Sequence, residues 1–296
     1  MASLGIRLFT DDGTGVQDPS LMRRAMTYAG PLGVRLAQHC EDELLAGGGV
    51  MNEGALSSRL GLSGRPALAE ELMVMRDIEL ARLTGCALHF LHLSTARSIA
   101  LVADARASGL DVTCEVAPHH FTLDESYCDQ YDATYKVHPP LRTLDDVSEL
   151  RRALIDGRVD AVATDHAPHE AQLKDLPFDE APPGMLGLEH AASLTLDVLG
   201  ENGALRLFEL LSRRPAAIAQ LRASDHRVRH SAHGGEVSVG EDANLVIFDP
   251  LATRTVDREL LQSRSNNTPY HGRVLRGATR ALLVRGSLVV VDGALR

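Results

Sequence analysis

Five short segments of this chain each carry an aspartate or a histidine at the end of an apolar run. These segments are LFTDDG at 8–13, LAQHCE at 36–41, LHFLHLST at 88–95, EVAPHH at 115–120 and AVATDHAPH at 161–169. Apolar runs that alternate with helix-like stretches predict parallel βα units. In a parallel α/β barrel the carboxyl ends of the strands meet on one face, so we expect these polar residues to converge there.

The alternation of strand-like and helix-like stretches continues to about residue 220. Helices are expected near 18–30, 66–84, 95–107, 144–156, 188–200 and 204–221. Only five strands are found where a closed barrel needs eight, which leaves two alternatives: an open doubly wound sheet or the later part of a barrel. After residue 235 the pattern changes to short strands and hairpins. We therefore predict a βα domain over 1–235 and a β-rich portion over 236–296, joined by a linker at 222–236.

The excess of acidic residues argues against two classes of partner. A net charge of −10 and a pI near 5.7 disfavour binding to nucleic acid or to an anionic membrane. No signal peptide and no apolar run of membrane-spanning length is visible. The four cysteines lack CxxC spacing, which is typical of reduced thiols in a cytoplasmic protein. Cys40, although it adjoins His39, is expected to pack in the core.

Two histidines and two aspartates at strand ends suit a divalent cation, and the imidazoles favour zinc. A two-metal hydrolase needs a bridging carboxylate, imidazoles and a further carboxylate that moves protons. Asp12 could bridge, His39 and His92 could hold one ion, and Asp165 could contact the other ion and act as general acid/base. For three further histidines of these segments we favour structural roles, because strand-end histidines often bond backbone carbonyls: His119, His120 and His166.

Several motifs carry a resemblance to a known family. They are FTDDG, QHCE, HLST, PPLR, TDHAPH, FDEAPPGMLGLE and RSNNTPYHG. In this order they resemble the class I (bacterial-type) dihydroorotases of the amidohydrolase superfamily. The resemblance implies a (β/α)8 barrel of the TIM type with a small β-sandwich and a binuclear zinc centre. It also implies the reversible cyclisation of N-carbamoyl-L-aspartate to L-dihydroorotate, a step of pyrimidine synthesis.

The resemblance also implies a role for individual residues. Asp12, with Asp11 as the alternative, corresponds to the bridging ligand, and His39 and His92 to ligands of the second zinc. Asp165 corresponds to a ligand of the first zinc and to the general acid/base. Substrate contacts are implied for four further positions: His138, His169, Pro183 and Gly184.

Two departures from the family pattern bear on activity. The metal-binding HxH and the adjoining arginine, which the family carries on its first barrel strand, have no counterpart in this sequence. We therefore expect a chain that lacks the family's N-terminal barrel strands, retains one zinc half-site and has little activity alone. His138 also replaces an asparagine that contacts substrate in the family, and a histidine is bulkier and titratable.

Two other functions stay open at this point. One is a non-catalytic dihydroorotase-like subunit that scaffolds aspartate transcarbamoylase. The other is a different cyclic amidohydrolase, such as an allantoinase or a hydantoinase; these share the architecture but usually carry a carboxylated lysine where this chain has Asp-Asp-Gly. A homodimer is a further possible assembly.

Overall fold

The computed structural model describes residues 1–221, 234–235 and 237–296. The predicted linker at 222–236, with its three histidines, lies almost entirely outside the described residues. The domain boundary at 235/236 therefore stays a prediction. Among the helices of the described ranges, none has the length and apolar character needed to cross a membrane.

A five-stranded parallel sheet forms the centre of the first part of the chain. The five strands are arranged in the order in which they occur along the chain, and each one pairs with the next. They are β1 (Leu8–Thr10), β2 (Arg35–Gln38), β5 (Ala87–Phe90), β6 (Val112–Val116) and β7 (Ala161–Val162); β3 and β4 lie outside this sheet. Because all pairings are parallel, the carboxyl ends of the five strands lie at one edge. The five predicted strands are confirmed.

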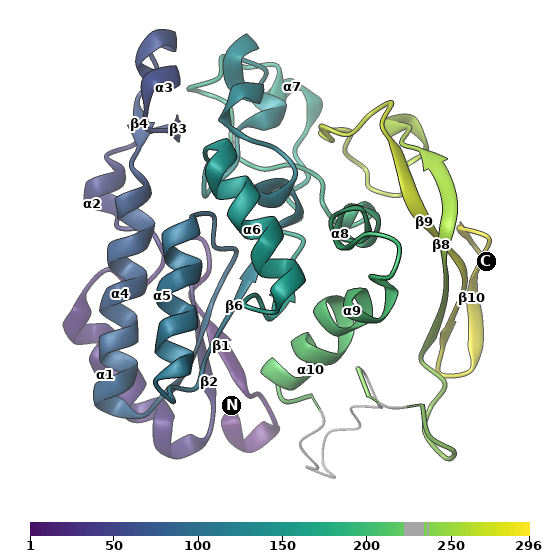
Figure 1. Ribbon diagram of the computed structural model, residues 1–296, viewed down its shortest axis with the longest axis horizontal. Helices are drawn as coiled ribbons and strands as arrows, with labels where there is room; N and C mark the ends of the chain where they lie inside the picture. Colours follow the sequence, from purple (N-terminus) through teal and green to yellow (C-terminus); the bar gives the residue numbers. More distant parts are fainter. Residues whose placement is uncertain (222–233, 236) are drawn as a thin grey trace.

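Four helices cover one face of this sheet side by side (Figure 1). They are α1 (Pro19–Ala29), α4 (Ala67–Thr84), α5 (Ala96–Ala107) and α6 (Leu144–Asp156). For α1, α5 and α6 the preceding residue explains where the helix begins: the side chains of Asp18, Thr95 and Thr143 each accept a hydrogen bond from a backbone N–H of the first turn. These four helices agree with the prediction to within one or two residues.

The stretch between β2 and α4 contains elements that the sequence pattern did not predict. It folds into α2 (Glu43–Ala46), β3 (Met51–Asn52), α3 (Ala55–Leu60) and β4 (Gly64–Arg65), and β3 pairs with β4 in parallel. A further short helix, α7 (Ala171–Lys174), follows β7. None of these elements exceeds six residues, so no periodicity could reveal them.

The prediction of one continuous helix over 204–221 is wrong. The segment consists of α9 (Ala204–Phe208), a π-helical turn (Glu209–Arg213) and α10 (Arg214–Ile218). Pro215 has no N–H to donate to the carbonyl four residues earlier, which favours a break in the α-helical pattern here. The preceding helix, α8, runs from Ala191 to Leu199, within the predicted range. Short 3-10 helices complete the set: Ala2–Leu4, Gly30–Leu32, Pro118–Phe121, Glu125–Gln130, Ala133–Tyr135 and Arg258–Leu260.

The C-terminal residues form a four-stranded antiparallel sheet, as predicted. Its order is β11-β10-β9-β8, with bounds β8 (Leu245–Thr255), β9 (Val274–Val284), β10 (Ser287–Val291) and β11 (Ala294–Leu295). The sheet packs on α8, where the Ser193 hydroxyl donates to the carbonyl of Gly277 over 3.4 Å. A side chain at Gly277 (φ 94°) would lie 2.3 Å from the Phe248 ring, so only glycine fits.

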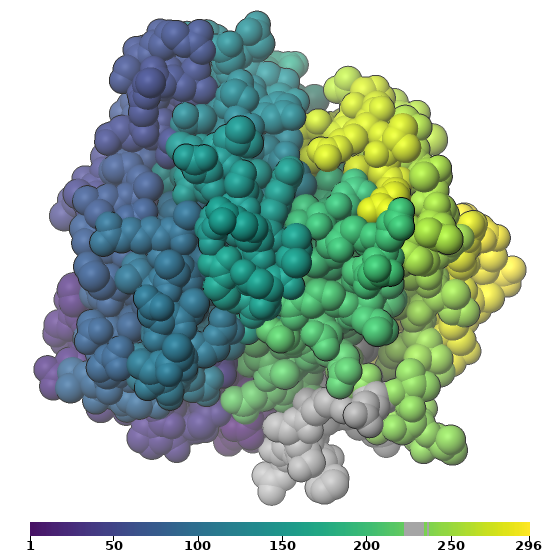
Figure 2. Space-filling model, in the orientation of Figure 1, coloured from purple at the N-terminus to yellow at the C-terminus, as the bar shows by residue number. Residues whose placement is uncertain are grey.

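The main apolar core lies between the parallel sheet and its helices. Leu88 and Phe90 of β5 are fully buried, and the four cysteines are buried free thiols. The predicted packing role of Cys40 agrees with its 1% exposure. Figure 2 shows the segments in sequence order across one face, from the purple N-terminal part to the yellow C-terminal sheet. The polar strand ends are therefore attached to a rigid, closely packed support.

Candidate functional site

Three of the predicted ligands converge at the carboxyl ends of β1, β2 and β5. The Nδ1 atom of His39 lies 3.2 Å from Nε2 of His92, and the latter lies 3.3 Å from Oδ1 of Asp12. His39 Nδ1 is 3.8 Å from the same carboxylate oxygen. The imidazoles are buried, whereas the Asp12 side chain is 53% exposed. One atom from each residue lies within 4.8 Å of the other two, an arrangement that could hold a metal ion.

The backbone at His92 is strained. Its φ of 30° lies in the left-handed region, which non-glycine residues seldom adopt. Neighbouring strands hold the turn on both sides: the Leu91 N–H donates to the Gln38 carbonyl (3.1 Å), and the Leu93 N–H to the Glu115 carbonyl (2.9 Å). Strain that the surrounding structure supports in this way is typical of functional sites.

The electrostatics of this cluster fit a metal-binding role. Burial, together with the nearby His92 and His138, lowers the pKa of His39 to about 3, so its ring is neutral with a free lone pair. Burial alone would lower the pKa of His92, but its hydrogen bond to Asp12 and the charge of Asp165 outweigh burial and raise it. The same hydrogen bond lowers the pKa of Asp12. The cluster thus favours a positive charge on His92 beside the Asp12 carboxylate, and a cation could take the place of that charge.

Asp165 lies apart from this group of three. It follows β7 with a φ of 43°, and Nε2 of His119 lies 3.6 Å from its Oδ2. His119 is 1% exposed, and burial lowers its pKa to about 4. Among the described residues, its Nε2 has no hydrogen-bond partner. His119 is therefore a candidate site residue that the sequence interpretation left as structural.

His120 and His166, the other two histidines for which a structural role is predicted, do have structural contacts. Nε2 of His120 lies 2.9 Å from the carbonyl of Pro139, as the prediction required. Nδ1 of His166 instead accepts from two backbone N–H groups, those of Gly187 and Leu188, each over 3.3 Å. The prediction that His166 bonds a backbone carbonyl is therefore wrong for Nδ1, but the contacts of this nitrogen are structural, as predicted.

His138 belongs to a second cluster with His39 and Glu41. The guanidinium of Arg65 enters this cluster: it pairs with Glu41, and its Nη1 lies 2.7 Å from Nε2 of His138. Burial would raise the pKa of Glu41, but contact with His138 and the charge of Arg65 lower it overall. Because Arg65 already supplies the positive charge here, we assign no metal to this second cluster.

The loops around His169 and Gly184 are held together by one asparagine. Nε2 of His169 lies 2.8 Å from the carbonyl of Pro183. Gly184 has a φ of 133°, and a side chain there would lie 2.5 Å from Ala167 Cβ and 2.8 Å from His169 Nε2. The Asn267 amide donates to the carbonyls of Ala167 (2.9 Å) and Gly184 (3.2 Å). The sequence interpretation quoted this asparagine within RSNNTPYHG but gave it no role.

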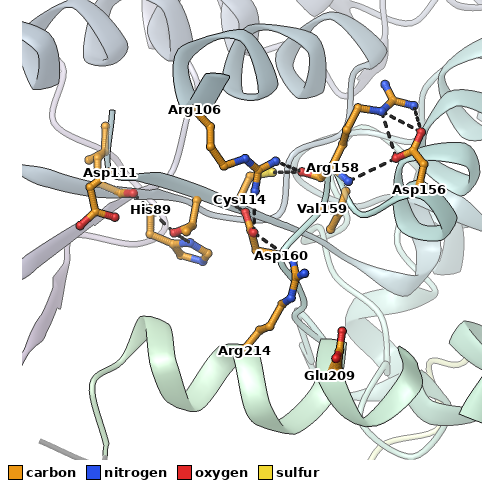
Figure 3. Close-up of polar contacts among 12 residues, drawn as sticks. His89, Arg106, Asp111, Cys114, Asp156, Arg158, Val159, Asp160, Glu209 and Arg214 are labelled. Carbon is orange, nitrogen blue, oxygen red and sulfur yellow. Dashed lines mark hydrogen bonds and ion pairs between the residues drawn. The ribbon is translucent and has the colours of Figure 1, made fainter. Parts of the chain in front are cut away.

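Figure 3 shows a separate polar cluster around Asp160. Asp160 directly precedes β7, so it lies at the amino end of that strand, whereas the candidate ligands follow the carboxyl ends of their strands. The buried carboxylate of Asp160 accepts from Arg106 (2.6 Å), from Arg214 (3.3 Å) and from the backbone N–H of Cys114 (3.0 Å). In βα barrels this amino-terminal end of the strands contributes to stability, whereas the carboxyl end carries chemistry. We therefore treat the Asp160 cluster as structural support.

Solved structures with this architecture define the fold class. A D-hydantoinase from Thermus sp. superposes with a TM-score of 0.81 at 24% identity, over 98% of this chain and 64% of that one. An L-hydantoinase from Arthrobacter aurescens gives a TM-score of 0.80 at 24% identity, over 98% and 65%. The chain thus shares the fold of these hydantoinases, and its described residues supply five parallel strands and the C-terminal antiparallel sheet.

Sequence relatives are closer. Residues 1–98 match a family described as Dihydro-orotase-like. A dihydroorotase of Pelotomaculum thermopropionicum is 44% identical over 296 residues, which is 100% of this chain and 67% of the relative. One from Mycobacterium tuberculosis is 43% identical over 294 residues, 98% of this chain and 66% of the relative. The chain belongs to the dihydroorotase family, a family of cyclic amide hydrolases, and spans about two thirds of the length of these relatives.

Proposed function

We propose that this chain carries the second-zinc half-site and the acid/base residue of a dihydroorotase. The reaction is the reversible cyclisation of N-carbamoyl-L-aspartate to L-dihydroorotate. The observation that carries the proposal is the convergence of Asp12, His39 and His92 from three neighbouring strands. Zinc is the ion of choice because two of the three donors are imidazole nitrogens.

Each residue has a proposed task. His39 and His92 would hold the ion through the nitrogens that face each other, and Asp12 would bridge to the family's other zinc position. When bound, zinc lowers the pKa of a water ligand and polarises a carbonyl oxygen. Asp165 would accept the proton of the attacking water and deliver it to the departing amide nitrogen. His119, 3.6 Å away, would face the Asp165 carboxylate during this transfer.

Four residues are proposed to contact the substrate: His138, His169, Pro183 and Gly184. The close approach of Ala167 and His169 leaves room only for a glycine at position 184, which holds this backbone tightly against the His169 loop. His138, beside Arg65, would meet an anionic group of the substrate, in the place where the family has an asparagine.

Zinc binding tests the half-site. The 296-residue chain should bind one zinc ion tightly, and His92→Ala or His39→Ala should weaken that binding. Two tight zinc ions per chain, or unchanged binding in both variants, would contradict the proposal. The assay is elemental analysis after dialysis against a weak chelator.

Turnover tests the reaction. The interconversion of dihydroorotate and carbamoyl-aspartate should be very slow with the 296-residue chain, because its sequence contains no HxH pair for the other zinc. A chimera that adds the barrel segment preceding the matched region of the Pelotomaculum relative should be active at roughly 1–10 per second. An inactive but folded two-zinc chimera would instead favour the non-catalytic scaffold, and turnover of hydantoin or allantoin but not dihydroorotate would favour the other amidohydrolases.

Partners form a separate part of the proposal. Small-molecule substrates follow from the family, whereas a homodimer or a complex with aspartate transcarbamoylase stays a prediction. Light scattering of the chain alone, and with a purified bacterial aspartate transcarbamoylase, would test both assemblies.

A further inference from the structure

A buried glutamate far from the ligands in sequence holds the turn that carries His92. Glu70, in the first turn of α4, is 1% exposed. Its carboxylate accepts from the backbone N–H groups of Ser94 (3.2 and 3.1 Å) and Thr95 (3.1 Å). It also accepts from both hydroxyls, those of Ser94 and of Thr95 (3.1 Å). All donors therefore come from the two residues that follow His92-Leu93.

Two features stabilise the negative charge of Glu70: the dipole of α5 and the nearby Arg142. Thr95 is the N-cap of α5, so the carboxylate lies at the positive end of that helix dipole. Arg142, only 2% exposed, donates through Nε to the Ser94 hydroxyl over 3.0 Å, and that hydroxyl in turn donates to Glu70. Arg142 also donates to the Arg65 carbonyl (2.9 Å), which joins the turn to β4. A buried charge with this many partners is rigidly placed.

The orientation of the His92 ring depends on this turn. Histidines that bind metals usually donate their second nitrogen to a carboxylate or a carbonyl, which fixes the ring. Among the described residues, however, Nδ1 of His92 has no hydrogen-bond partner. The ring direction must therefore come from packing and from the backbone, and that backbone is in the strained left-handed conformation (φ 30°). The bonds from Ser94 and Thr95 to Glu70 are those that close the turn on its C-terminal side.

We propose that Glu70 is a positioning residue of the metal centre: by closing the 92–95 turn, it aims Nε2 of His92 at His39 and Asp12. The inference rests on the proposed metal-binding role of His92. It adds a role for a residue that touches neither the metal nor the substrate.

The test is cobalt binding by the full chain, with Co²⁺ as the spectroscopic probe. Glu70→Gln keeps the size of the side chain but replaces one acceptor oxygen by a donor, which must face the N–H and O–H groups of the turn. We expect the Co²⁺ affinity to fall about 10- to 100-fold and the visible d–d bands to change. Glu70→Asp, which keeps the charge on a shorter stem, should recover part of the affinity.

The matched control is Asp160→Asn. Asp160 is also a buried carboxylate with several charged and backbone donors, but it lies at the opposite end of the sheet. Its loss should lower the melting temperature and leave Co²⁺ affinity and spectrum unchanged. An equal loss of affinity in Asp160→Asn would mean that general destabilisation explains the effect, and would overturn the proposal.

Two further variants separate the possible failures. If His92→Ala binds Co²⁺ as tightly as the unmodified chain, the proposed metal centre itself fails. If His92→Ala loses binding while folded Glu70→Gln keeps normal affinity and spectrum, only the positioning role fails. Should Glu70→Gln not fold, Ser94→Ala decides, because it removes the hydroxyl that donates to Glu70 and accepts from Arg142 but keeps the backbone bonds to Glu70. An unchanged Co²⁺ spectrum in that variant overturns the proposal.

Discussion

Replacement of His92 by alanine is the sharpest test of the proposed metal centre. The structure offers three donors that converge on one point, two buried imidazoles and one half-exposed carboxylate. Structural zinc sites with four protein ligands bind with about 10–16 kcal/mol at neutral pH, or roughly 3 kcal/mol per ligand. Loss of one ligand should therefore weaken zinc binding on the order of 100-fold.

The loss of zinc affinity should be larger for variants of the buried ligands than for a variant of the exposed one. Removal of His92 or His39 should cost more than Asp12→Asn, because Asp12 is half exposed and water can replace its oxygen. The assay is competition for Zn²⁺ with a coloured chelator, with folding checked by circular dichroism. His89→Ala is the matched control: His89 lies on β5, just before the turn that carries His92, is likewise buried, and contacts Thr113 and Glu115 instead of the cluster. Normal zinc affinity in folded His92→Ala, or an equal loss in His89→Ala, would refute the reasoning.

Three other predictions follow from the described residues. Asp165→Asn in the HxH-complemented chimera should keep zinc within about threefold but abolish turnover, because an amide cannot accept the proton; zinc analysis with the dihydroorotate assay checks this. Burial raises the pKa of Asp77 from 3.8 to about 6, so the folded state binds more protons between these pH values and stability falls as pH rises through this window. Relative to Asp77→Asn, the unmodified chain should therefore lose up to about 3 kcal/mol between pH 4 and pH 7 in urea unfolding, and an equal pH profile in both would contradict the burial argument. Leu88→Ala, at a fully buried position of β5, should lower the unfolding free energy by about 2–5 kcal/mol, and a loss below 1 kcal/mol would mean that the site collapses around the smaller residue.

Much of the fold and part of the site could be predicted from local patterns. Strands and long helices have their own periodicities. Side chains such as those of Thr95 and Thr143 cap a helix by bonding a backbone N–H three residues later, so this signal lies within a short stretch of sequence. The three candidate ligands Asp12, His39 and His92 could be picked out for the same reason: each follows an apolar strand, and parallel strands bring such positions together. The periodicity of apolar residues and the polar residue that follows each apolar run are therefore enough to predict these features.

Other features were decided only by the tertiary structure. The bonds from Ser94 to Glu70 span 24 residues, and those from Asn267 to Ala167 span 100. The approach of His119 to Asp165 likewise depends on how two strand ends pack, and nothing near His119 in the sequence distinguishes it from its structural neighbour His120.

The physical reason is that such contacts form between groups whose neighbours along the chain do not specify them. A buried carboxylate, amide or imidazole must find its partner wherever the packed backbone leaves a donor or an acceptor. The sequence of this protein therefore determined which residues reach the strand ends, and the packing of α4, β5 and the C-terminal loop decided how those residues are aimed.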